Sequence, residues 1–137
     1  MVTHRAIEKS GVIRKNFSAL TDATDYLGSV QIRNVATIGG NICTAAPSAD
    51  TATPLLVFGT QAKIKNLKEE RTVAIEQFFK GSGETVLKPG ELVRELFIPN
   101  PLPHTGSASY KHQLLFALGL PILDISVLIS ICINKVT

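Results

Sequence analysis

Cysteine is scarce in this chain of 137 residues, which has only Cys43 and Cys132, far apart and without a CxxC spacing. A zinc site or an iron–sulfur cluster needs several such ligands close together, so neither can be built from this chain. The three histidines, His4, His104 and His112, also have no carboxylate or cysteine at metal-ligand spacing. We therefore predict reduced thiols, surface or hydrogen-bonded histidines, and no metal site.

Clustered charge is also missing. The formal net charge is +3, and the basic residues form neither a run nor a patch interleaved with aromatic residues. The sequence therefore predicts no nucleic-acid partner. No P-loop, nucleophile elbow or catalytic pair of carboxylates stands out either. The N-terminus has no apolar signal-peptide region, which predicts a cytoplasmic location.

A single long apolar run, residues 114–133, resembles a membrane span in length. Gly119 and Pro121 interrupt it, and Asp124 would cost about 2.5 to 3.5 kcal/mol in lipid. The second half of the run is rich in β-branched residues. That half therefore predicts a buried strand, and no membrane span.

The rest of the pattern predicts one domain, residues 1–137, of mixed architecture. Helices are predicted at 5–10, at 18–27 and from Asp50 to Phe58, and a helical turn at 76–80. Strands are predicted at 62–67, 71–75, 92–99 and 107–115 and in the last apolar run, the first two as a hairpin. Helices early and strands late favour an α+β fold, an antiparallel sheet of about five strands with flanking helices.

The segment from 31 to 50, QIRNVATIGGNICTAAPSAD, carries the most chemical information. A strand-like run leads into Gly39 and Gly40, which can adopt φ > 0 and let backbone N–H groups converge on an anion. Thr37, Asn41 and Arg33 add a hydroxyl, an amide and a positive charge, the donor types that suit phosphate oxygens. The segment can therefore be a diphosphate-binding turn, although a Gly-Gly pair after a strand is also an ordinary turn.

Asp50, at the end of this segment, cannot contact a diphosphate because two anions repel each other. Its carboxylate can accept hydrogen bonds from hydroxyl groups, such as those of a ribose or ribityl chain. It can equally cap the helix that follows.

Four stretches, 3–29, 31–42 (QIRNVATIGGNI), 46–56 (APSADTATPLL) and 78–93 (FFKGSGETVLKPGELV), occur in one order. Together they resemble the FAD-binding subunit of the molybdenum hydroxylases, the xanthine dehydrogenase and carbon monoxide dehydrogenase family. The resemblance covers nearly the whole chain. It implies an FAD cofactor and the larger subdomain of the PCMH-type (vanillyl-alcohol-oxidase-like) FAD-binding fold.

The resemblance also implies a role for individual residues. The FAD diphosphate is expected to lie along Thr37, Ile38, Gly39, Gly40 and Asn41.

Four further positions follow from the same resemblance. Asp50 is expected to bind a cofactor hydroxyl, and Leu92 or Val93 to pack near the flavin ring. Lys111 is expected to place its ammonium close to the isoalloxazine, where a cation stabilises the negative charge of a reduced flavin.

Members of this family begin with a smaller FAD subdomain that has its own Gly-rich loop, and end with a further C-terminal domain. Neither is found in this chain, so the resemblance implies a fragment that catalyses nothing on its own. In the family, molybdopterin and iron–sulfur clusters are on partner subunits, and FAD passes electrons to NAD or another acceptor.

Two alternatives stay open. UDP-N-acetylenolpyruvylglucosamine reductase has a related FAD-binding fold and a similar Gly-rich turn, but lacks the PSAD continuation. The chain can also be a non-flavin assembly module whose Gly-Gly segment shapes a protein interface.

Overall fold

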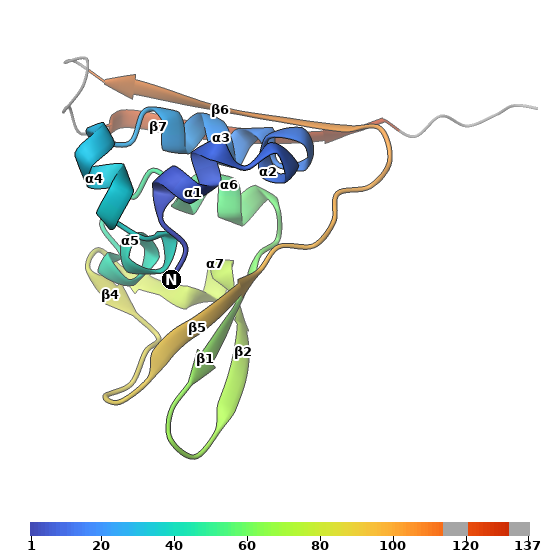
Figure 1. Ribbon diagram of the computed structural model, residues 1–137. Coiled ribbons are helices and arrows are strands. Elements are labelled where there is room, and N and C mark those ends of the chain that lie inside the picture. The colour runs from blue at the N-terminus through green and yellow to red at the C-terminus, as the bar shows by residue number, and fades with distance from the viewer. Residues whose placement is uncertain (114–120, 132–137) are drawn as a thin grey trace, which may run out of the picture.

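The computed structural model describes residues 1–113 and 121–131. Its elements form three layers, shown in Figure 1, with a β-hairpin at the top, helices in the middle and a small sheet at the bottom. The α+β class predicted from the sequence is confirmed.

Seven helices are found in the described part of the chain, most of them short. They are α1 (His4–Lys9), α2 (Gly11–Asn16), α3 (Ser18–Asp25), α4 (Val30–Val35), α5 (Ile38–Thr44), α6 (Ala52–Val57) and α7 (Ile75–Phe78). The helices predicted at 5–10 and 18–27 correspond to α1 and α3, and the one predicted to end at Phe58 corresponds to α6.

Side-chain caps explain where four of the helices begin. The hydroxyls of Thr3, Ser10, Ser29 and Thr37 accept hydrogen bonds from the backbone N–H groups in the first turns of α1, α2, α4 and α5. An N-cap of this kind stabilises a helix by about 1 kcal/mol. The Ser29 cap starts a helix where the sequence predicted a strand-like run, so that prediction is wrong.

The strands are β1 (Gln61–Lys65), β2 (Glu70–Ala74), β3 (Phe79–Gly81), β4 (Glu84–Thr85), β5 (Leu92–Phe97), β6 (Thr105–Gln113) and β7 (Pro121–Ser130). The predicted β1–β2 hairpin is confirmed, and β5 pairs with β1 on its other edge. The five predicted strands do not form one sheet, however. β6 and β7 pair only with each other among the described strands, and β3 with β4 forms a third small sheet.

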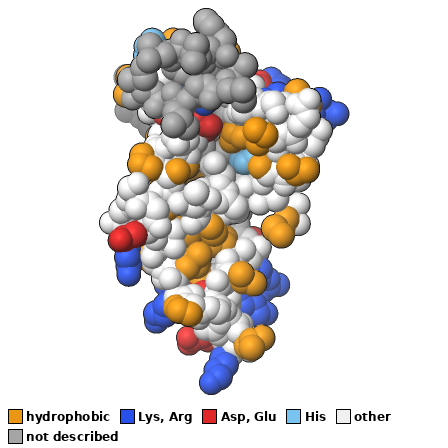
Figure 2. Space-filling view, turned by 90° about the vertical axis from the view of Figure 1, so that its left-hand side faces the viewer, with side chains coloured by type: hydrophobic (Ala, Val, Ile, Leu, Met, Phe, Trp, Pro, Cys, Tyr) orange, Lys and Arg blue, Asp and Glu red, His pale blue; other side chains and the backbone are white. Residues whose placement is uncertain are grey.

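Lys and Arg side chains gather at the lower end of the molecule, where β1 and β2 meet in their hairpin, as Figure 2 shows. Several of them pair with carboxylates across the strands. Lys63 lies 3.0 Å from Glu95, and Arg94 lies 2.7 Å from Glu70. Both pairs are exposed to solvent, so each contributes little to stability.

The β6–β7 hairpin has a polar inner side and an apolar outer side. Ser107, Ser109 and Lys111 of β6 alternate with exposed residues and point toward the helices. The exposed apolar side chains on the two strands are Ala108, Tyr110, Leu123, Ile125, Val127 and Ile129. The strand predicted in the last apolar run is thus confirmed, but the prediction that it is buried is wrong.

Residues 114–120 and 132–133 of that apolar run lie outside the described residues, and so do the last two residues of the strand predicted at 107–115. Within the described residues, no helix is long and apolar enough to cross a membrane.

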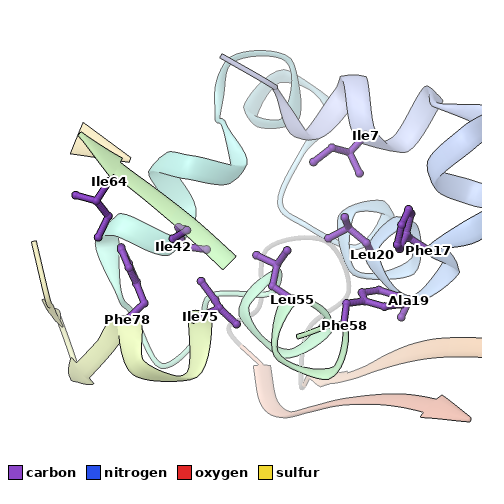
Figure 3. Close-up of a cluster of buried hydrophobic side chains, with 11 residues drawn as sticks. Ile7, Phe17, Ala19, Leu20, Ile42, Leu55, Phe58, Ile64, Ile75 and Phe78 are labelled. Atoms are coloured by element: carbon purple, nitrogen blue, oxygen red, sulfur yellow. The ribbon is translucent and has the colours of Figure 1, made fainter. Parts of the chain in front are cut away.

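One continuous hydrophobic core runs through the helical layer, as Figure 3 shows. It extends from Ile64 of β1 past Phe78 and Leu55 to Leu20 of α3. The rings of Phe17 and Phe58 meet edge to face, 5.2 Å between centroids. Because α5 and α6 both contribute to this core, the segments around residues 37–41 and 50–51 are held on a rigid support.

His4 is fully buried, contrary to the prediction of a surface or hydrogen-bonded histidine. Neither of its ring nitrogens has a hydrogen-bond partner among the described residues. Burial lowers the pKa of His4, and the nearby Arg33 guanidinium lowers it further. The imidazole is therefore held in its neutral form, for which burial is least costly.

An ion pair between the half-buried Arg71 and the buried Glu91 ties β2 to the turn before β5. Arg71 donates two hydrogen bonds to the carboxylate of Glu91, at 3.0 and 2.8 Å, and a third to the carbonyl of Val86. The N–H of Lys88 also donates to Glu91. The hydrogen bonds from Arg71 and Lys88 lower the pKa of Glu91 to about 2.

This low pKa predicts a pH-dependent contribution to stability. Because the unfolded chain has the higher pKa, the contribution of Glu91 is fully present above about pH 4.5 and is lost as the pH falls toward 2. We expect Glu91→Gln to lower the urea midpoint at pH 7, and the difference from wild type to shrink steadily below pH 4.5. Glu84→Gln, at an exposed position, is the control. A difference that is the same at pH 7 and pH 3 contradicts this role.

Candidate functional site

The predicted diphosphate-binding segment is the first turn of α5 rather than a loop. Thr37 precedes the helix, and its hydroxyl accepts a hydrogen bond from Gly40 N–H at 3.1 Å. Gly39 and Gly40 are helical, and neither has a positive φ. The prediction of a Gly-Gly turn with φ > 0 is therefore wrong, because the Thr37 cap starts a helix at Ile38.

The two glycines have different surroundings. A Cβ on Gly40 would come within 3.2 Å of the Thr37 hydroxyl, whereas a Cβ on Gly39 would meet nothing within 4 Å. The N–H of Ile38 donates to Val2 and that of Asn41 to Thr37. No described residue accepts a hydrogen bond from Gly39 N–H. Gly39 therefore offers an unpaired backbone donor beside open space.

Arg33, expected as a phosphate donor, is used inside the protein. Its side chain is buried and donates to the Glu8 carboxylate at 3.1 Å and to the carbonyls of Leu27 and Gly28. It joins α4 to α1 and to the end of α3, so its predicted role is wrong.

Asn41 connects α5 to the segment that carries Asp50. Its side-chain oxygen accepts a hydrogen bond of 2.6 Å from the hydroxyl of Thr51. Thr51 precedes α6 and makes no side-chain cap, and Asp50 lies one residue earlier. Asp50 thus does not cap α6, which removes one of its two predicted roles.

Asp50 instead forms an ion pair with Lys111 on β6. The Lys111 ammonium lies 2.8 Å from Asp50 Oδ1, and the two side chains are only 8% and 10% exposed. Burial raises the pKa of Asp50, and the Lys111 ammonium offsets part of this increase. The structure therefore brings together two predicted site residues that are 61 positions apart in the chain.

A cluster of polar residues behind this ion pair was not predicted. Ser126 donates to the hydroxyl of Thr53 at 3.0 Å and lies 2.9 Å from the hydroxyl of Ser109. Asp124 of β7 is the Cα partner of Lys111 across the hairpin. The sequence signal was the alternation of Asp124 and Ser126 with apolar residues in the last apolar run.

Leu92 and Val93 lie apart from this ion pair. Both are on β5, in the bottom layer of Figure 1, while Lys111 is on β6 in the top layer. Leu92 is 74% exposed, and Val93 packs against the hydrophobic core.

A mostly apolar hollow of about 290 Å³ lies between the end of α5, the start of α6 and β3. Its lining includes Pro47, Thr53, Leu56 and Phe79. Thr53 also belongs to the polar cluster behind Lys111, but neither Asp50 nor Lys111 lines the hollow.

Comparison with known proteins gives a consistent result. Residues 1–101 match the family described as "FAD binding domain in molybdopterin dehydrogenase". The chain is 37% identical over 119 residues to the xanthine dehydrogenase FAD-binding subunit of Escherichia coli O157:H7, covering 86% of this chain and 41% of that protein. It is 32% identical over 112 residues to the nicotinate dehydrogenase FAD-subunit of Eubacterium barkeri, covering 80% and 38%.

Solved structures show the same fold. A reconstituted CO dehydrogenase from Oligotropha carboxidovorans superposes with a TM-score of 0.90 at 23% identity, covering 95% of this chain and 45% of that chain. Quinoline 2-oxidoreductase from Pseudomonas putida 86 superposes with a TM-score of 0.78, also at 23% identity, covering 90% and 42%. The chain therefore spans less than half the length of the relatives that it matches.

Proposed function

Because the chain belongs to the family of FAD-binding domains of molybdopterin dehydrogenases, we propose that it forms part of an FAD site in a molybdenum-containing hydroxylase. This chain would hold the diphosphate and face the flavin. The N-terminal FAD subdomain that the resemblance implies would complete the site. FAD, when bound, supplies the electron transfer.

The observation that carries the proposal is the unpaired N–H of Gly39 beside open space. A phosphate oxygen is a suitable acceptor for it, and a missing Cβ permits close approach. The hydroxyl of Thr37 and the amide N–H₂ of Asn41 flank this position as further donors. Ile38 and Gly40 complete the turn. Ile38 directly precedes Gly39, and Gly40 leaves room for the Thr37 cap because it has no Cβ.

Asp50 and Lys111 would act beyond the diphosphate. The second oxygen of the Asp50 carboxylate is available to accept a hydrogen bond from a cofactor hydroxyl. The Lys111 ammonium would stabilise negative charge on the reduced flavin, and its ion pair with Asp50 fixes its position. We keep Leu92 as a proposed contact of the flavin ring because its side chain is free to make one, and Val93 as a residue that supports it from the core.

The partners follow from the same proposal. Electrons would arrive from iron–sulfur clusters and a molybdopterin centre on other subunits, and NAD or another acceptor would take them from FAD. A cytoplasmic location and the absence of a nucleic-acid partner remain predictions from the sequence.

Replacing the two flanking donors tests the cofactor role. We expect Thr37→Ala combined with Asn41→Ala to weaken FAD binding at least tenfold, because each hydrogen bond to a charged phosphate contributes about 1.5 to 3 kcal/mol. FAD affinity is measured by quenching of flavin fluorescence. The chain is titrated alone and together with the Gly-rich N-terminal segment that the family resemblance implies.

Ser10→Ala is the matched control because Ser10 caps α2 as Thr37 caps α5. It should lower the stability about as much as Thr37→Ala alone, because Asn41→Ala also removes the hydrogen bond from Thr51, and it should leave FAD affinity unchanged. Docking to the partner subunits of a relative is measured in parallel. If the double variant loses docking while FAD affinity stays the same, the chain is an assembly module and the cofactor proposal is wrong.

A further inference from the structure

Three charged side chains meet where the β6–β7 hairpin packs on the segment before α6. Lys111 holds Asp50 at 2.8 Å. Asp124 is directly opposite Lys111 in the antiparallel pair, and both point to the inner side of the hairpin. Directly opposite residues have Cβ atoms about 4.5 to 5.5 Å apart on one face of a sheet. Asp124 therefore places a second carboxylate on the same face as the Lys111 side chain, whose ion pair is with Asp50.

Hydroxyl groups from three elements hold this arrangement in place. Ser109 of β6, Ser126 of β7 and Thr53 of α6 form a chain of hydrogen bonds of 2.9 and 3.0 Å. The backbone N–H of Ser109 also donates to the Asp22 carboxylate of α3 at 3.2 Å. The charged groups of the described residues around Asp124 are thus Lys111, Asp50 and, behind Ser109, Asp22.

The charges in this cluster do not balance. A single ammonium faces two carboxylates, and it can neutralise only one of them. Burial and the charge of Asp50 both raise the pKa of Asp124, and hydrogen bonding by Thr53, the Lys111 charge and Ser109 offsets part of that increase. The two aspartates therefore compete for the same cation.

We propose that Asp124 is a positioning residue that shares the Lys111 ammonium with Asp50 and so determines how much of its positive charge reaches the cofactor. This inference rests on the proposed function, in which Lys111 faces FAD. An ionised Asp124 opposes the binding of the anionic cofactor. When Asp124 is protonated, the positive charge of Lys111 interacts only with Asp50 and FAD. FAD affinity should therefore rise as Asp124 becomes protonated.

The competition is tested without FAD, by NMR titration of the aspartate carboxyl carbons in the ¹³C-labelled chain. In wild type we expect Asp50 and Asp124 to titrate as a coupled pair, each curve showing the ionisation of the other. Asp50→Asn should lower the pKa of Asp124 because a like charge is removed, and Lys111→Met should raise it. Asp25→Asn, on the exposed end of α3, is the control and should change neither curve.

FAD affinity provides the second measurement. We expect Asp124→Asn to bind FAD about threefold to tenfold more tightly than wild type at pH 8, and to lose the pH dependence shown by wild type. A substitution that only disturbed packing would weaken binding at every pH.

The outcomes separate this inference from the proposed function. If the wild-type curves of Asp50 and Asp124 are independent and neither Asp50→Asn nor Lys111→Met moves the Asp124 curve, the inference is wrong even when FAD binds. If the carboxyls are coupled but no form of the chain binds FAD, the proposed function is wrong, and with it the role of Asp124 toward the cofactor.

Discussion

Asp50→Ala is expected to lower the free energy of unfolding by about 3 kcal/mol, a large part of the stability of a domain of this size. The substitution leaves the Lys111 ammonium nearly buried without its partner at 2.8 Å. Breaking a buried pair by removing one partner costs about 3 to 5 kcal/mol, because the remaining charge is uncompensated. We expect a loss of stability at the lower end of this range because the Asp124 carboxylate, opposite Lys111, still compensates part of the ammonium charge.

Urea unfolding of the double variant Asp50→Ala, Lys111→Met provides the matched comparison. It removes both charges, so most of the lost stability should return, giving an interaction energy of about 2 kcal/mol in the double-mutant cycle. If Asp50→Ala changes the stability by less than about 0.5 kcal/mol, the ion pair does not hold the hairpin on the helical layer.

Phe78→Ala is expected to have the other large effect, a loss of about 3 to 5 kcal/mol. Phe78 is 0% exposed and lies beside Ile64 of β1 and Ile42 of α5, toward one end of the core, as Figure 3 shows. Its ring also meets Phe79 edge to face at 5.4 Å. Truncation would leave a cavity beneath α5, so the first turn that carries Gly39 would lose its support.

Phe97→Ala is the control because Phe97 is 49% exposed on β5. Its cost should be less than about 1 kcal/mol by urea unfolding. Equal losses for the two phenylalanines would show that Phe78 does not belong to a continuous core.

The sequence predicted elements well where periodicity or a cap was local. The β1–β2 hairpin alternates clearly, and α3 has its apolar residues Leu20 and Ala23 on one buried side. The prediction of a strand-like run at 30–35 was wrong. Val30, Ile32 and Val35 come close to the alternating apolar spacing of a strand. The Ser29 cap and the long-range contact of Arg33 with Glu8 decide for a helix instead.

Local sequence patterns could not predict contacts between residues that are far apart in the chain. The resemblance placed Asp50 and Lys111 near one cofactor, but their ion pair depends on how the hairpin packs on α3 and α6. The burial of His4 likewise depends on α1 packing against α3 and α4. The division of the five predicted strands into two sheets followed from the linker 98–104, which carries the chain across the helical layer (Figure 1).

The most direct test of the account is FAD binding by Gly39→Leu. A Cβ at Gly39 meets no protein atom within 4 Å, and the residue is helical, so leucine should fold there without loss of stability. If the diphosphate lies against Gly39, the new side chain occupies its place. Gly11→Leu, at a helical glycine of α2 that is equally open, is the matched control.

Flavin fluorescence titration, with the N-terminal segment supplied, gives the answer. We predict that wild type and Gly11→Leu bind FAD equally and that Gly39→Leu binds at least tenfold more weakly, with an unfolding midpoint no lower than that of wild type. A Gly39→Leu chain that binds FAD as tightly as wild type would contradict the account.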